Sequence, residues 1–451
     1  MTGLLRSDAT ALDAQDPLAE LRARFHIPRR EDGTEAVYLC GHSLGLAPKR
    51  ALSIVNEELN VWARLGVDGH FAGERPWVSY HELASNSLAH LAGAQPSEVV
   101  AMNSLTVNLH LLLTSFYRPQ GKRRKILLES LAFSSDRYAI ESQLRVHGLD
   151  PSDALLLVTP REGESELRTD DICAQIAAAG AELATVLLPG VQYLTGQSLD
   201  LRTITAAAHA VGATAGFDLA HAIGNTPLAL HDWDVDFAVW CSYKYLNSGP
   251  GAIGGAFVHE RHARSRLPRL AGWWGHDKQS RFAMPPAFVP LPGAEGWQVS
   301  NPSILATAPL LASLAIFEEA GLDHLRRKSL ALTGYLETLL LARASDRLTI
   351  LTPRDPAARG CQLSLRLLSS AEAARALHVE LTELGFICDW REPDVIRVAP
   401  VPLYNTFVEV WEFVDALSSL LKTASSNSPS PAPRGRVRGG GSSSSSSPPS
   451  S

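Results

Sequence analysis

Between residues 125 and 242 the chain alternates short, unbroken apolar runs with stretches of helical pattern. The apolar runs lie at 125–130, 155–160, 183–190, 214–220 and 236–242. Helices are predicted between them, opening near Ser134, at Thr169 and near Leu201. Continuous apolar strands that alternate with helices are typical of a mostly parallel sheet covered on both faces. The sequence therefore predicts an α/β fold with a central parallel sheet.

The rest of the chain divides into parts of different character. Residues 1–65 predict an N-terminal arm and a linking helix, 66–303 a large domain that contains the sheet, and 304–424 a smaller α+β domain. Residues 425–451 are rich in Ser, Pro and Gly, and we expect this tail to be disordered because it cannot bury enough apolar surface. Its arginines could form a basic docking motif, although a solvated tail is the simpler interpretation.

Charge and composition argue against several classes of protein. A formal net charge of −6 gives no electrostatic reason to expect binding to nucleic acid or to a membrane surface. No stretch approaches the ~20 apolar residues that a membrane span needs, and the N-terminus is too polar for a signal peptide, so we expect a cytosolic protein. The five cysteines are scattered and form no CxxC pair, which argues for reduced thiols and against a zinc site.

Three motifs at predicted strand and helix ends could carry chemistry. In the first, Asn103 or Ser104 can cap a helix whose free N–H groups, next to Thr106, would suit a phosphate. For this motif alone, an ordinary capped core helix is the favoured interpretation. In the second, an apolar strand delivers Asp218 at its carboxyl end, where α/β sheets place their ligands. A carboxylate there suits a protonated pyridine nitrogen, but it could also cap the next helix.

The third motif sets Lys244 between two tyrosines at the end of an apolar strand, followed by a Gly-Pro-Gly turn. A partly desolvated lysine has a lowered pKa and can form an imine, whereas a solvated surface lysine is the alternative. The combination is more informative than each motif alone. Asp218 lies 26 residues before Lys244, and both stand at strand ends before small-residue loops. This layout resembles fold-type-I pyridoxal-phosphate enzymes.

The chain also resembles the kynureninase family over nearly all of its ordered length. The resemblance rests on separate segments: YLCGHSLGLAPK (38–49), GERPW (73–77), NSLTVNLHLLL (103–113), TPREGE (159–164), GFDLAHAIGN (216–225), WCSYKYLN (240–247), GWWGH (272–276), VSNPSIL (299–305) and IRVAPVPLYN (396–405). It implies hydrolysis of the Cβ–Cγ bond of L-kynurenine or 3-hydroxy-L-kynurenine with pyridoxal phosphate as cofactor. It also implies a homodimer with shared active sites.

The resemblance assigns roles to individual residues. Lys244 is expected to hold the cofactor as a Schiff base and to move the substrate Cα proton, Asp218 to pair with the pyridine nitrogen, and Tyr243 to donate a proton. Further cofactor-binding residues are expected to be Leu105, Thr106, Phe133, Ser134, Ser135, Asp136, His221, Trp273 and Asn301. Arg397 is expected to bind the substrate α-carboxylate, and His70 and Asn301 to contact its aromatic ring. No metal ligand is implied.

Alternatives remain for several of these residues. Trp273 could be a plain interface aromatic, His70 a surface histidine, and Arg397 the partner of a protein carboxylate. Three departures from the family pattern (His42, Ser134 and Pro189) leave the phosphate contacts open. A cysteine desulfurase, a class V aminotransferase and a non-catalytic relative are the rival functions. The desulfurase is disfavoured because Cys361 and Cys388 lie in strand-like runs.

Overall fold

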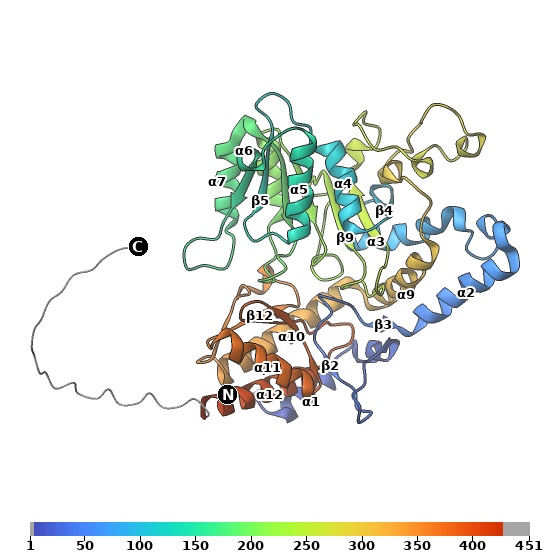
Figure 1. Ribbon diagram of the computed structural model, residues 1–451. Helices are drawn as coiled ribbons and strands as arrows, with labels where there is room; N and C mark the ends of the chain where they lie inside the picture. The colour runs from blue at the N-terminus through green and yellow to red at the C-terminus, as the bar shows by residue number, and fades with distance from the viewer. Residues whose placement is uncertain (1–3, 427–451) are drawn as a thin grey trace, which may run out of the picture.

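Two β-sheets organise the chain in the computed structural model, which describes residues 4–426 (Figure 1). The larger sheet has seven strands in the order β4-β10-β9-β8-β7-β5-β6. Its members are β4 (Val99–Ala101), β5 (Lys125–Glu129), β6 (Leu155–Val158), β7 (Leu183–Pro189), β8 (Thr214–Asp218), β9 (Phe237–Cys241) and β10 (Gly254–Val258). Neighbours from β6 to β9 run parallel, and β10 runs antiparallel to β4 and β9.

The five strands expected from the apolar runs are thus confirmed, and so is the mostly parallel sheet. The helices between them form as α5 (Ser134–Val146), α7 (Thr169–Ala179) and α8 (Leu201–Ala210). The sequence reading did not include β4 or β10. Strand β10 begins with two glycines, which read as a turn rather than as a strand, and β4 has only three residues.

Both faces of this sheet are buried, as continuous apolar strands require. On one face, α4 (Leu105–Phe116) and α5 pack on side chains such as Ile126, Leu128 and Val239. On the other face, α7 and α8 pack on Leu127, Val186 and Leu188. Successive residues of one strand therefore enter opposite cores, because side chains alternate across a strand.

The smaller sheet is antiparallel, with the order β11-β12-β15-β14. It consists of β11 (Leu348–Ile350), β12 (Leu363–Leu367), β14 (Asp389–Arg391) and β15 (Val395–Val398). The helices α10 (Leu322–Arg343), α11 (Ala371–Glu383) and α12 (Phe407–Ser426) bury its apolar side chains in a separate core. The domain bounds expected from the sequence stay a prediction, and the tail expected over 425–451 lies outside the described residues beyond Ser426.

The N-terminal segment joins the two sheets. Helix α1 (Arg6–Asp13) packs on α12, and β2 (Val37–Tyr38) pairs in parallel with β13 (Phe386–Ile387). The long helix α2 (Lys49–Leu65) packs along α9 (Ile304–Ala320), as Figure 1 shows. Within residues 4–426 no single helix is long and apolar enough to cross a membrane; α9 and α10 reach that threshold only as a pair bent by 83°.

Candidate active site

A cavity opens at the carboxyl ends of the parallel strands, where β7, β8 and β9 stop and their loops begin. It is lined by Leu105, Thr106, Glu129, Phe133, Ser135, Asp136, Pro189, Val191, Tyr193, Asp218, Ala220, His221, Tyr243 and Lys244. Nine residues predicted from the sequence stand in this lining: Leu105, Thr106, Phe133, Ser135, Asp136, Asp218, His221, Tyr243 and Lys244. Open α/β sheets bind ligands at this edge because the loops there converge.

Lys244 reaches into the cavity from the loop that follows β9. Its Nζ lies 3.0 Å from Nε2 of His221 and 5.9 Å from the ring centroids of both Phe133 and Tyr243. Burial and the charge of Lys244 hold the pKa of His221 well below its usual range, so this imidazole is neutral. A neutral His221 can accept a hydrogen bond from the Lys244 amine and orient it toward the cavity.

The N-terminal GHSLG segment fixes the loop that carries Lys244. The Gly45 N–H donates to the carbonyl of Tyr243 at 2.8 Å. A Cβ atom at Gly45 would collide with the Lys244 carbonyl oxygen and with Asn247, so only glycine permits this approach. The position of the Lys244 backbone therefore depends on a segment about 200 residues earlier in the chain.

Asp218 ends β8 and is buried beneath the cavity. Its Oδ1 accepts the Ala220 N–H at 2.7 Å. Burial raises the pKa of Asp218, while this N–H and the charge of Lys244 act in the opposite direction. Burial and the adjacent Asp218 raise the pKa of Asp136, on α5, well above its usual range. Asp136 is therefore the member of the pair that keeps a proton, and Asp218 is the one that can carry the charge.

A third buried carboxyl group, Glu129, lines the same cavity and was missed by the sequence analysis. It is the last residue of β5, and its Oε1 accepts a hydrogen bond from Gln192 Nε2 at 3.3 Å. Burial raises the pKa of Glu129 to about 7. The signal was present in the sequence, since Glu129 ends an apolar strand at the same edge as Asp218.

The opposite end of the cavity is formed by the start of α4. Ser104 is the N-terminal cap residue by its backbone position, but its side chain caps no N–H group, and Asn103 donates to Asn108 instead. The expected side-chain cap is therefore wrong, and the free N–H groups of α4 suit an anion better than a capped helix would. Thr106 Oγ1 lies 2.8 Å from Ser135 Oγ, and both hydroxyls line the cavity.

Five predicted site residues do not line this cavity within a single chain: Arg397, described below, and Ser134, Trp273, Asn301 and His70. Ser134 is exposed at the first turn of α5. Trp273 is 41% exposed and donates from Nε1 to the Arg281 carbonyl at 2.9 Å. Asn301 is exposed beside Ser300, and His70 Nδ1 lies 3.0 Å from the Val67 carbonyl. The roles predicted for these side chains stay predictions.

Arg397 lies on β15 of the small sheet, behind the lining residue Tyr193. It is 1% exposed and donates from Nη1 to the Tyr193 carbonyl at 2.6 Å and from Nε to Asp389 Oδ2 at 2.7 Å. The alternative of a protein carboxylate partner is thus realised in Asp389. Tyr193, which the sequence analysis also missed, lines the cavity and meets the Phe133 ring edge-on at 5.4 Å. Arg397 is therefore held one residue away from the cavity lining.

The geometry disfavours one rival function. A cysteine desulfurase needs a nucleophilic cysteine on an accessible loop. Cys241, Cys361 and Cys388 are buried, and burial raises the pKa of the Cys361 thiol to about 12. Cys173 lies on helix α7, and Cys40 is half-buried. Neither Cys40 nor Cys173 lines the Lys244 cavity.

Comparison with solved structures bears on the fold. The C-DES mutant with glycine covalently linked to its pyridoxal-phosphate cofactor matches 88% of this chain and 98% of its own, with a TM-score of 0.72 and 17% identity. The cysteine desulfurase CsdA from Escherichia coli matches 91% of this chain and 98% of its own, with a TM-score of 0.72 and 18% identity. At these identities the likeness establishes the shared fold.

Sequence comparison is more specific. Residues 325–417 match the kynureninase C-terminal domain. A kynureninase from Xanthomonas campestris is 57% identical over 412 residues, which cover 91% of this chain and 97% of the relative. A kynureninase from Koribacter versatilis is 56% identical over 407 residues, 90% of this chain and 95% of the relative. Identity of this extent, together with the cavity around Lys244, shows that the chain belongs to the kynureninase family of pyridoxal-phosphate enzymes.

Proposed function

We propose that the protein hydrolyses the Cβ–Cγ bond of L-kynurenine and 3-hydroxy-L-kynurenine, releasing L-alanine and anthranilate or 3-hydroxyanthranilate. The observation that carries the proposal is the Lys244 amine facing a cavity whose floor is the buried Asp218 carboxylate. Kynureninases 56–57% identical over nine-tenths of the chain support the choice of substrate.

The residues around the cavity fit pyridoxal phosphate. The uncapped start of α4 and the Thr106 hydroxyl suit the phosphate, the face of Phe133 suits the ring, and Asp218 suits a protonated pyridine nitrogen. Lys244 is the amine for the covalent link. Pro189 lines the cavity without a side-chain donor, so backbone N–H groups and hydroxyls of α4 and α5 must bind the phosphate. When bound, the cofactor supplies an electron sink for charge that develops at the substrate Cα and Cβ.

Two groups of this chain are placed to move protons. The Lys244 amine, held by neutral His221, takes the proton from the substrate Cα. Burial raises the pKa of the Tyr243 hydroxyl above its usual value, so that this phenol stays protonated at neutral pH. Tyr243 is therefore suited to donate a proton to the substrate Cβ when the carbon–carbon bond breaks.

Arg397 is the group proposed to bind the substrate α-carboxylate. Asp389 and the Tyr193 carbonyl fix its guanidinium, which orders the donor fork before a substrate arrives. Trp273, Asn301 and His70 are proposed to complete the site from a second copy in a homodimer, since they do not line the cavity of their own chain.

The biological setting proposed for this reaction is tryptophan catabolism and the de novo synthesis of NAD, in the cytoplasm. The substrate is a small molecule, and the acidic net charge of −6 supports neither a nucleic-acid nor a membrane partner.

A product assay tests the proposed function. The purified holoenzyme is incubated with each kynurenine, and both products are quantified by chromatography. We expect alanine and the aromatic acid in equal amounts. Recovery of an intact carbon chain as a keto acid would indicate an aminotransferase, and release of sulfide from cysteine would indicate a desulfurase. Either result without alanine and anthranilate would contradict the proposal.

A further inference from the structure

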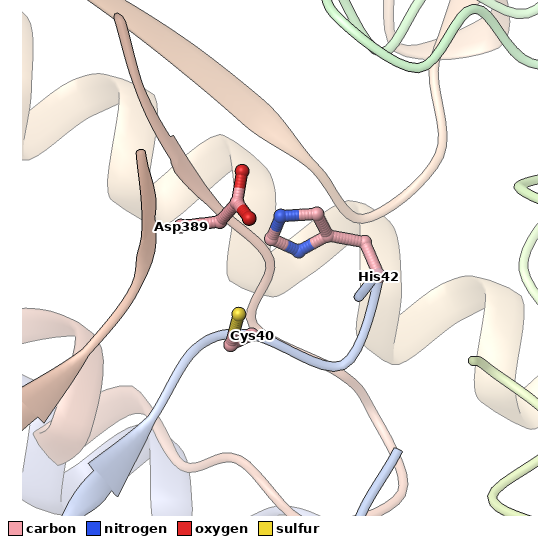
Figure 2. Close-up of side chains that lie close together, drawn as sticks. All are labelled: Cys40, His42 and Asp389. Atoms are coloured by element: carbon pink, nitrogen blue, oxygen red, sulfur yellow. The ribbon is translucent and has the colours of Figure 1, made fainter. Parts of the chain in front are cut away.

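A second cluster of side chains lies next to Arg397, and two of its members, Cys40 and His42, have no part in the proposed reaction. Cys40 and His42 follow β2, and Asp389 begins β14, almost 350 residues later in the chain. Figure 2 shows the three side chains converging from these two segments. One atom of each (the Cys40 sulfur, a His42 ring nitrogen and an Asp389 oxygen) lies within 4.8 Å of the other two.

His42 is the member that points to a ligand. Its side chain is 0% exposed, and neither ring nitrogen has a hydrogen-bond partner among the described residues. A buried polar group that is left unpaired costs free energy comparable to a lost hydrogen bond. In Figure 2 the ring lies next to the Asp389 carboxylate, with the Cys40 thiol below them. An occupant of this space would therefore satisfy an imidazole that the protein itself leaves unsatisfied.

Asp389 has coordinating capacity left. Its Oδ2 accepts from Arg397 Nε at 2.7 Å and from Arg391 Nε at 3.0 Å. Its Oδ1 has only a long contact of 3.5 Å with Arg391 Nη2 among the hydrogen bonds of the described residues. One oxygen thus holds the arginines, and the other is available.

We propose that Cys40, His42 and Asp389 bind one divalent cation of the zinc type. Thiolate, imidazole and carboxylate are the ligands that Zn²⁺ takes in proteins, and three of them leave the fourth tetrahedral position to water. Ligand atoms around Zn²⁺ are about 3.5 Å apart, so the cluster has to contract by about 1 Å. Cys40 loses its thiol proton to water when it binds the cation. Scattered cysteines could not reveal this site, because one ligand comes from a distant strand.

The surrounding charges decide how tightly the cation binds and what it changes. Arg397 and Arg391 both contact Asp389, and the charge of Lys244 also acts on His42, so a cation there meets three positive neighbours and binds more weakly than in a closed structural zinc site. A bound cation also competes with Arg397 for the negative charge of the Asp389 carboxylate. This second effect rests on the proposed function, in which Arg397 binds the substrate carboxylate: loading the site raises KM for kynurenine.

Direct titration tests the site without relying on activity. The holoenzyme is treated with a chelator, desalted and titrated with Co²⁺, whose bond to a thiolate gives a near-ultraviolet absorption band, and Zn²⁺ is then added as competitor. We expect one cation per chain. Cys40→Ser and His42→Asn are each expected to weaken binding by more than about 10-fold, since even residues that only orient ligands contribute that much. Cys173→Ser, a change on α7, is the matched control and leaves binding unchanged.

Each result has a defined meaning. Absence of a thiolate–cobalt band, or equal binding by the wild type and Cys40→Ser, overturns the cation site. In the kinetic arm, ZnCl₂ is expected to raise KM about 5-fold or more in the wild type but not in His42→Asn. Binding without a change in KM overturns the coupling to Arg397. Binding to a protein that never cleaves kynurenine, with or without zinc, leaves the site standing and refutes the proposed function.

Discussion

Two regions near Lys244 hold opposite kinds of buried group: the acidic wall of its cavity, and an arginine cluster on the small sheet behind the lining residue Tyr193. The wall formed by the strand ends of the large sheet holds three buried carboxyl groups, Glu129, Asp136 and Asp218, and burial raises the pKa of each. The small-sheet side holds Arg397 and Arg391 around the single carboxylate of Asp389. The buried carboxyl groups suit a cationic heterocycle, and the arginine cluster suits a substrate carboxylate. The proposed function assigns the cofactor to the first region and the substrate carboxylate to the second.

The largest effect is expected from removing the charge of the acidic wall. Asp218→Asn should lower kcat for kynurenine by about 100-fold or more, because the pyridine nitrogen loses the anion that keeps it protonated. Steady-state kinetics at saturating cofactor measure the change. Asp200→Asn is the control: Asp200 accepts the Thr203 N–H at the start of α8, and asparagine can accept the same hydrogen bond, so stability and activity should both change little. Equal kcat losses in both variants would show that the charge of Asp218 has no specific role in the reaction.

The arginine side should respond in KM rather than in kcat. Arg397→Lys replaces a buried bidentate donor with a point charge, and KM for kynurenine should rise about 10-fold or more. Arg391→Lys changes the neighbouring partner of Asp389 and should have a much smaller effect, because Arg391 is the more exposed of the two. If Arg391→Lys raised KM as strongly as Arg397→Lys, the result would contradict a specific role for Arg397 in binding the substrate carboxylate.

The prediction for Glu129 concerns the pH dependence of stability rather than the turnover of substrate. The pKa of Glu129 is raised from 4.5 to about 7 by burial, so between these values the folded protein holds a proton that the unfolded chain releases. The stabilisation is complete below about pH 4.5 and is lost as the pH rises through about 7. Glu129→Gln cannot ionise and should remove about 3 kcal/mol of this pH dependence. Urea unfolding of both proteins at several pH values measures this difference. If the free energy of unfolding had the same pH dependence in both, the pKa of Glu129 would not be raised by folding.

The difference between these two regions also explains how much the sequence could predict. Strand ends are visible in one-dimensional patterns, so Asp218 and Lys244 were placed correctly at one edge of a parallel sheet. The prediction of a side-chain cap on α4 was wrong, because the Asn103 side chain donates a hydrogen bond to Asn108 Oδ1 and the Ser104 side chain caps no N–H group. Strands β4 and β10 escaped notice because one is short and the other opens with glycines.

The small-sheet side could not be predicted from local patterns. Arg397 bonds the Tyr193 carbonyl, 204 residues away, and the Cys40–His42–Asp389 cluster spans almost the whole chain. Such contacts depend on how the two sheets pack together, which periodicity does not encode. For the same reason Trp273, Asn301 and His70 were assigned by resemblance, and their roles stay predictions.

The central claim is that Lys244 is the amine that binds the cofactor, and one measurement addresses it directly. The yellow holoenzyme is reduced with borohydride, digested, and the cofactor-bearing peptide is identified by mass spectrometry. The Lys244–Asp218 geometry predicts that the label lies on Lys244, within the segment WCSYKYLN, and that Lys244→Ala incorporates none, whereas the surface variant Lys422→Ala is labelled normally. Stoichiometric label on any other lysine, or undiminished label in Lys244→Ala, would contradict the claim.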